Sequence, residues 1–200
     1  MLLLALLLAP PPSPSGYFIR GATVYDGSGR PGVVGNVIIV GDKLADKRHP
    51  GDTVIDGTGL AVCPGFIDLH THCDSGLQTA GGKANTNYVR QGCTTVVTGN
   101  CGSGPVDAAK YFAKLTTSGV GTNVAHLAPH NSIREAVLGN ADRAPTAAEL
   151  ADMRAKVAQA MTDGTFGLST GLIYTPGTYA KTEEIIALAE VAGTAGGLYA

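Results

Sequence analysis

The 200-residue sequence has no tryptophan, only four cysteines, and charged side chains at only 15% of its positions. So few charges beside 44% apolar residues exclude a disordered chain, which shows the opposite balance. A net charge of −2 offers no basic surface for nucleic acid, so we expect no nucleic-acid partner. A chain of this length buries a core without disulfide staples, so the cysteines are open to metal chemistry.

Long apolar runs are also missing. Residues 1–9 are apolar, but a bilayer span needs ~20 such residues, so we expect no membrane span. Residues 1–16 resemble the core of a signal peptide but lack a basic start and a clear cleavage site. We interpret them as a signal-like or disordered tail, which leaves the location open between cytoplasmic and exported.

Residues 17–62 contain short β-type runs separated by Gly and Asp turns. Runs at 17–20, 22–25, 37–40 and 53–55 predict a small antiparallel β element with no chemistry of its own.

Residues 63–200 alternate strand and helix patterns, which predicts an α/β fold with a parallel sheet. We expect strands at 66–69, 94–98, 123–127, 166–170 and 196–200, and helices at 85–91, 105–115, 146–163 and 182–192. No strand leads into a Gly-x-Gly-x-x-Gly loop, so a (β/α)8 TIM-type barrel fits better than a dinucleotide fold. Such a barrel takes ~250 residues, so we expect its first half, truncated in strand five.

His70 and His72 follow the apolar run 66–69. Side chains alternate along a strand, so both imidazoles are expected on one side at its C-terminal end, where they can bind one metal ion. Two ordinary histidines on a half-buried strand are the alternative.

Cys101 follows the next strand and is flanked by glycines at 99 and 102, which indicates a loop shaped around something. Thiolate and imidazole are favoured zinc ligands, so His70, His72 and Cys101 form the predicted metal site. A small buried thiol is the alternative for Cys101. Cys73 is expected to face outward, away from His72.

Three further residues lie near the predicted site. Asp74 is a candidate to orient a ligand histidine, or else a turn cap. His130, in the exit loop of the third strand, is a weak candidate to support the metal or contact substrate. His126 is expected to be a packed or hydrogen-bonded residue.

Three ordered stretches carry a family resemblance. Residues 64–72 (PGFIDLHTH) resemble the first-strand signature of the amidohydrolase superfamily. Residues 92–102 (GCTTVVTGNCG) and 164–177 (GTFGLSTGLIYTPG) are similar to segments of its D-aminoacylase, or N-acyl-D-amino-acid deacylase, family.

This resemblance implies a zinc-dependent enzyme, with one or two ions, that hydrolyses the amide bond of small N-acyl-D-amino acids. It implies a barrel beside a small β-sandwich begun by residues 17–62, and places a further ligand histidine and the catalytic Asp beyond residue 200. The catalytic residue within this chain is therefore unknown. Ser169 and Tyr174 are candidates to line the substrate mouth, with turn packing as the alternative.

Two alternatives remain. A cyclic-amide hydrolase of the hydantoinase or dihydroorotase type often has a bridging lysine at strand four, and residues 166–172 contain none. The chain is otherwise expected to behave as an incomplete, non-catalytic fragment with exposed strand edges.

Overall fold

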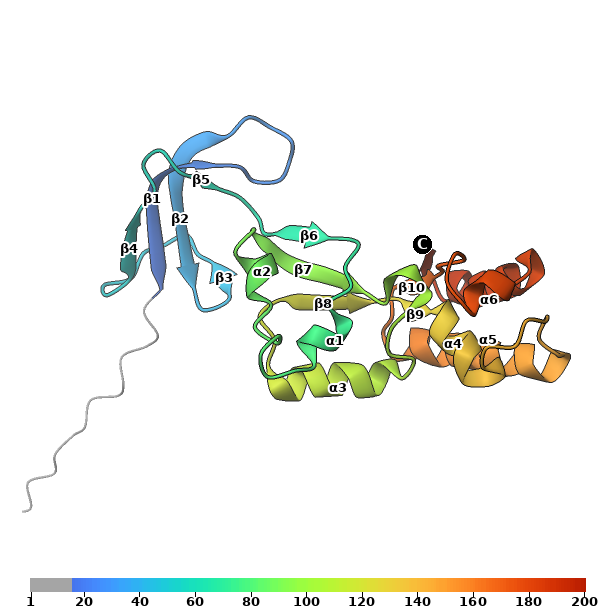
Figure 1. Cartoon of the computed structure of the whole chain (residues 1–200). Helices are drawn as coiled ribbons and strands as arrows, with labels where there is room; N and C mark the ends of the chain where they lie inside the picture. Colours follow the sequence, from blue (N-terminus) through green and yellow to red (C-terminus); the bar gives the residue numbers. More distant parts are fainter. Residues whose placement is uncertain (1–15) are drawn as a thin grey trace, which may run out of the picture. The chain divides into compact units, whose positions relative to one another are not determined.

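The computed structural model describes residues 16–200, whose backbone divides after Pro64 into two compact units, residues 16–64 and 65–200 (Figure 1). The predicted N-terminal tail lies almost wholly outside the described residues. None of the described helices is long and apolar enough to cross a membrane.

The first unit is a single five-stranded sheet. Its strands are β1 (Tyr17–Val24), β2 (Val33–Val40), β3 (Lys43–Leu44), β4 (Thr53–Asp56) and β5 (Ala61–Val62). β1 pairs with β2 in antiparallel fashion and with β4 and β5 in parallel fashion, so the purely antiparallel prediction is wrong. The two runs expected on either side of Gly21 are one strand, because a bulge between Ile19 and Ala22 absorbs the left-handed glycine (φ 69°).

The second unit alternates strands with helices along the chain. Its first half contains β6 (Phe66–Asp68), α1 (Asp74–Leu77), α2 (Thr86–Val89), β7 (Cys93–Thr98), the 3₁₀ turn η1 (Asn100–Gly102), α3 (Ala108–Ser118) and β8 (Asn123–His126). Its second half contains β9 (Ala128–Pro129), α4 (His130–Leu138), α5 (Ala147–Thr162), β10 (Gly167–Ser169), the 3₁₀ turn η2 (Gly177–Tyr179), α6 (Thr182–Thr194) and β11 (Leu198–Tyr199).

Two parallel sheets run through this unit, in the orders β6-β7-β8 and β9-β10-β11. One residue separates β8 from β9, and the Phe166 amide donates to the His126 carbonyl at 2.9 Å, so the second sheet continues from the first. The carboxyl ends of β6 and β7, neighbours in one sheet, therefore meet at one edge.

A separate apolar core supports each sheet. Val96 of β7 packs with Leu77 of α1 and with Tyr111 and Leu115 of α3. The larger core packs the second sheet against α4, α5 and α6, and consists of Ala128, Ile133, Met153, Val157, Ala160, Leu168, Leu188 and Ala192. The helix expected after Thr146 forms as α5, with the Thr146–Glu149 capping box in place.

Within the described residues β6 pairs on one side only, with β7, and its Phe66 and Ile67 side chains are 58% and 61% exposed. The structure corrects two local expectations. α3 begins beyond Pro105, where the Asp107 side chain accepts the Lys110 amide at 2.9 Å and caps the helix. His130 is the first residue of helix α4 rather than part of an exit loop. The sequence does not reveal the start of α4, because Pro129 occupies the cap position and no side chain caps the helix.

Candidate metal centre

His70 and His72 lie in the segment that leaves β6. The buried Thr71 between them anchors this segment to β7, since its amide and hydroxyl both donate to the Val97 carbonyl, at 3.1 and 2.7 Å. The two imidazoles remain exposed, with ring centroids 5.3 Å apart. The structure thus brings the histidines together, but β6 ends at Asp68, so the strand alternation we expected does not act here.

Cys101 lies in η1, directly after β7, and has a left-handed backbone (φ 53°, ψ 29°). Its Sγ is 3.4 Å from His70 Nε2. One ligand atom each from His70, His72 and Cys101 lie within 4.8 Å of one another. Residues from two neighbouring strand ends therefore converge on one point.

These three donors suit zinc. Zinc bonds of 2.0–2.3 Å in a tetrahedral arrangement place ligand atoms ~3.5 Å apart, close to the separation of the Cys101 sulfur and the His70 nitrogen. Two imidazoles and a thiol are also the ligand chemistry that zinc prefers.

Asp74 holds the Cys101 loop rather than a ligand histidine. Its Oδ1 accepts the Gly99 amide at 2.8 Å and lies 3.8 Å from His126 Nδ1. His126 is fully buried and makes hydrogen bonds to Thr98 and Pro105, in line with a packed, hydrogen-bonded residue. Burial lowers the pKa of His126 and outweighs the opposing effects of these hydrogen bonds and of Asp74.

Cys73 does not face outward as expected. It packs against the core around Leu77 and Val96, and its Sγ lies 3.4 Å from Thr71 Oγ1. Burial is the main cause of its raised thiol pKa. The expectation is wrong because the chain has left the strand before residue 73.

Ser169 and Tyr174 occupy different environments. Ser169 is only 1% exposed, and its hydroxyl lies between Gly99 and Gly102 of the Cys101 loop. Tyr174 is 54% exposed in the segment between β10 and η2. The buried Ser169 hydroxyl bonds to the Cys101 loop, whereas the Tyr174 side chain is exposed on the surface.

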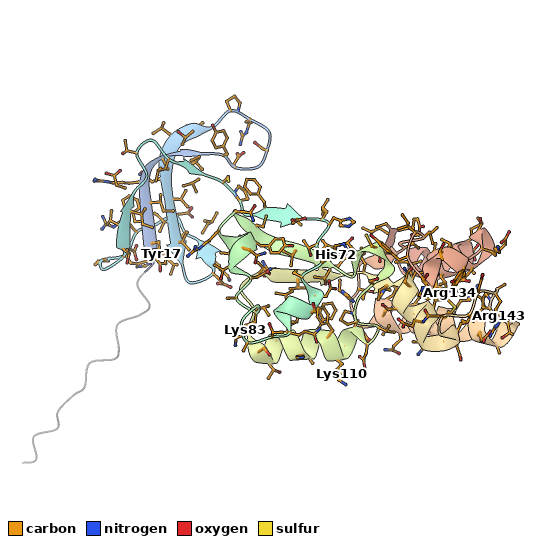
Figure 2. The ribbon with its side chains drawn as sticks, in the orientation of Figure 1. Tyr17, His72, Lys83, Lys110, Arg134 and Arg143 are labelled. Carbon is orange, nitrogen blue, oxygen red and sulfur yellow. The ribbon has the colours of Figure 1, made fainter. Side chains whose placement is uncertain are left out.

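His130 is fully buried and does not belong to the group of three donors; it lies in a polar cluster that the sequence did not predict. Its Nε2 hydrogen-bonds to Glu184 of α6 at 2.8 Å, and Glu184 also pairs with Arg134 of α4. Figure 2 marks Arg134 in the region of α4 to α6. His130 and Arg134 are four residues apart, a spacing that reveals a shared face only once the helix is known.

Burial favours a raised pKa for Glu184. The hydrogen bonds from His130 and Arg134, with the charge of Arg134, outweigh it and lower the pKa of this carboxyl. Glu184 is therefore a carboxylate at neutral pH, and links α4 to α6.

Residues 53–195 match the model of an amidohydrolase family. The chain belongs to this amidohydrolase family. Among curated amidohydrolase relatives, N-acyl-D-aspartate deacylase from Alcaligenes xylosoxydans xylosoxydans is 38% identical over 94% of this chain and 43% of its own length. D-aminoacylase from the same organism is 36% identical over 94% of this chain and 44% of its own length.

Two solved structures are similar in fold. N-acyl-D-glutamate deacylase from Bordetella bronchiseptica, in complex with zinc and a phosphonate inhibitor, matches with a TM-score of 0.85 at 32% identity. A D-aminoacylase with a binuclear metal centre matches with a TM-score of 0.84 at 33% identity. Each match covers 92% of this chain and 44% of the other, so the chain spans less than half the length of these relatives.

Proposed function

We propose that this chain carries the zinc site of an enzyme that hydrolyses the amide bond of N-acyl-D-amino acids. The observation that carries the proposal is the convergence of His70, His72 and Cys101 within 4.8 Å, in a chain similar to deacylases along nearly its whole length. The substrate is then a small molecule. The parallel strands of the second unit are proposed to be the first strands of a (β/α)8 barrel, which holds its site at the carboxyl ends of its strands.

In this proposal His70, His72 and Cys101 hold one or two zinc ions. When bound, zinc acts as a Lewis acid on an amide carbonyl and makes water more acidic. The chain's other residues position these ligands: Thr71 ties the histidine segment to β7, and Asp74 ties the Cys101 loop to α1.

The absence of lysine supports a deacylase over a cyclic-amide hydrolase. β10 and the residues after it, through Leu172, contain no lysine that would bridge two metal ions. Cys101, whose Sγ lies 3.4 Å from His70 Nε2, would instead supply a sulfur ligand to the metal.

The test is zinc binding together with substrate hydrolysis. His70→Ala is compared with His49→Ala, which removes an exposed histidine from the first unit. We expect His70→Ala alone to abolish zinc retention in the purified chain. In the protein as its source expresses it, the same change should abolish hydrolysis of N-acetyl-D-amino acids, with N-acetyl-L-amino acids as the stereochemical control. Unchanged zinc retention in His70→Ala rejects the ligand assignment, and equal turnover of D and L substrates rejects the substrate class.

A further inference from the structure

The loop that carries Cys101 has an unusual backbone. Gly99 and Gly102 have φ angles of 77° and 69°, and Cys101 between them has a φ of 53°. A left-handed conformation is unfavourable for a residue with a side chain, and persists only where neighbouring groups enforce it. Some feature of the surroundings must therefore hold Cys101 in place.

Ser169 touches this loop on both sides of Cys101. Its hydroxyl donates to the Gly99 carbonyl and accepts the Gly102 amide, the latter at 3.0 Å. Gly99, Gly102 and Ser169 are all buried, so water does not replace either bond. A single hydroxyl thus satisfies two buried backbone groups that flank one residue.

The support beneath Ser169 is rigid. Ser169 ends β10, the central strand of its sheet, which pairs with β9 on one side and β11 on the other. Two residues later, a Cβ on Gly171 would lie 2.1 Å from the Cys101 carbonyl oxygen, so the chain leaving β10 lies directly against Cys101. β10 therefore acts as a support for the Cys101 loop.

We propose that Ser169 is a positioning residue that holds the Cys101 sulfur beside His70 for metal binding. The inference rests on the proposed role of Cys101 as a zinc ligand and extends it to a residue on another strand. Without the hydroxyl, the Gly99 carbonyl and the Gly102 amide are left unpaired, and the left-handed geometry of Cys101 loses the one side chain that bonds to the backbone on both sides of it. In this role Ser169 acts through Cys101 and does not line the substrate mouth.

The test compares Ser169→Ala with Ser132→Ala in the purified chain. Ser132 is the matched control, since its hydroxyl accepts the Gly104 amide at 3.1 Å, in the same loop but three residues beyond Cys101. We expect Ser169→Ala to weaken zinc binding ~10- to 100-fold in a chelator competition, the range known for groups that orient metal ligands. It should also weaken the cobalt–thiolate absorption band, whereas Ser132→Ala should leave both nearly unchanged.

A second measurement on the metal-free chain separates the outcomes. The rate at which iodoacetamide alkylates Cys101 is measured by mass spectrometry and divided by the rate for the exposed Cys63 in the same sample. We expect Ser169→Ala to speed alkylation of Cys101 about tenfold, the effect of losing one or two hydrogen bonds. If the alkylation ratio and the band match those of Ser132→Ala, the role of Ser169 is rejected. If the unaltered protein binds no zinc as its source expresses it, the proposed function fails, and the alkylation ratio alone decides the role of Ser169.

Discussion

The buried cluster of His130, Arg134 and Glu184 permits a quantitative prediction about stability. Glu184 on α6 is 2% exposed, and its two partners on α4 are fully buried. Replacing Glu184 by Gln keeps the shape of the side chain but leaves the Arg134 charge without a counter-ion. Breaking a buried pair in this way costs ~3–5 kcal/mol.

That loss is a large part of the free energy of unfolding of a typical domain, ~5–15 kcal/mol. It should also depend on pH in a defined direction. Because the pKa of Glu184 is lowered in the folded state, its stabilisation is complete above the ordinary value of 4.5 and is lost as the pH falls through the lower folded value. The wild-type advantage over Glu184→Gln should therefore be constant near neutral pH and shrink below 4.5.

Urea denaturation at a series of pH values measures this difference. Arg143→Ala is the control, because it breaks the exposed Arg143–Glu149 pair in the same unit and should cost much less. Arg134→Met combined with Glu184→Gln should cost less than the sum of the single changes, since it removes both charges. Equal losses for Glu184→Gln and Arg143→Ala, or a difference independent of pH, would refute this account.

Three further predictions use the same structure. Cys101→Ser should weaken zinc retention by more than ~10- to 100-fold, the range for groups that only orient ligands. Cys73→Ser should leave zinc retention nearly unchanged. Equal zinc retention by the two variants in a chelator competition contradicts the assignment of Cys101 as a ligand. Burial raises the pKa of Tyr111 to about 12, so the free energy of unfolding should fall as the pH rises from 10 towards 12. The Tyr111→Phe variant should lose less stability over this range, and denaturation that gives the same pH dependence for both proteins would contradict this. Gly99→Ala should lower the melting temperature more than Gly139→Ala. Both glycines have positive φ, but an added Cβ lies 2.2 Å from a backbone carbonyl oxygen at Gly99 and meets no atom within 4 Å at Gly139. Equal melting temperatures would show that this close approach is relieved without cost.

Part of the fold was readable from local chemistry. The helix expected from residue 146 forms as α5, where the Thr146–Glu149 box caps its start and Met153 and Val157 lie buried on one face. The alternation of strands and helices predicted a parallel α/β arrangement. These features depend on neighbours within a few residues, which the sequence displays directly.

The candidate site was predictable in part. His70, His72 and Cys101 were chosen as donors, and the structure brings them together, although along a different route from the one expected. The strand is shorter than its apolar run suggests, since β6 ends at Asp68. The bond between Thr71 and β7 places the histidines instead, and no local pattern announces a bond across 26 residues.

The sequence by itself determined the donor chemistry, the start of α5 and the alternation of strands with helices, since each is encoded by residue type and short spacing. Only the tertiary structure decided that Ser169 supports the Cys101 loop, that His130 pairs with Glu184 rather than approaching the metal donors, and that Cys73 turns inward. These contacts join residues 54 to 70 positions apart, or follow from where a strand ends. They arise from the packing of strands and helices that lie far apart in the sequence, which local spacing does not record.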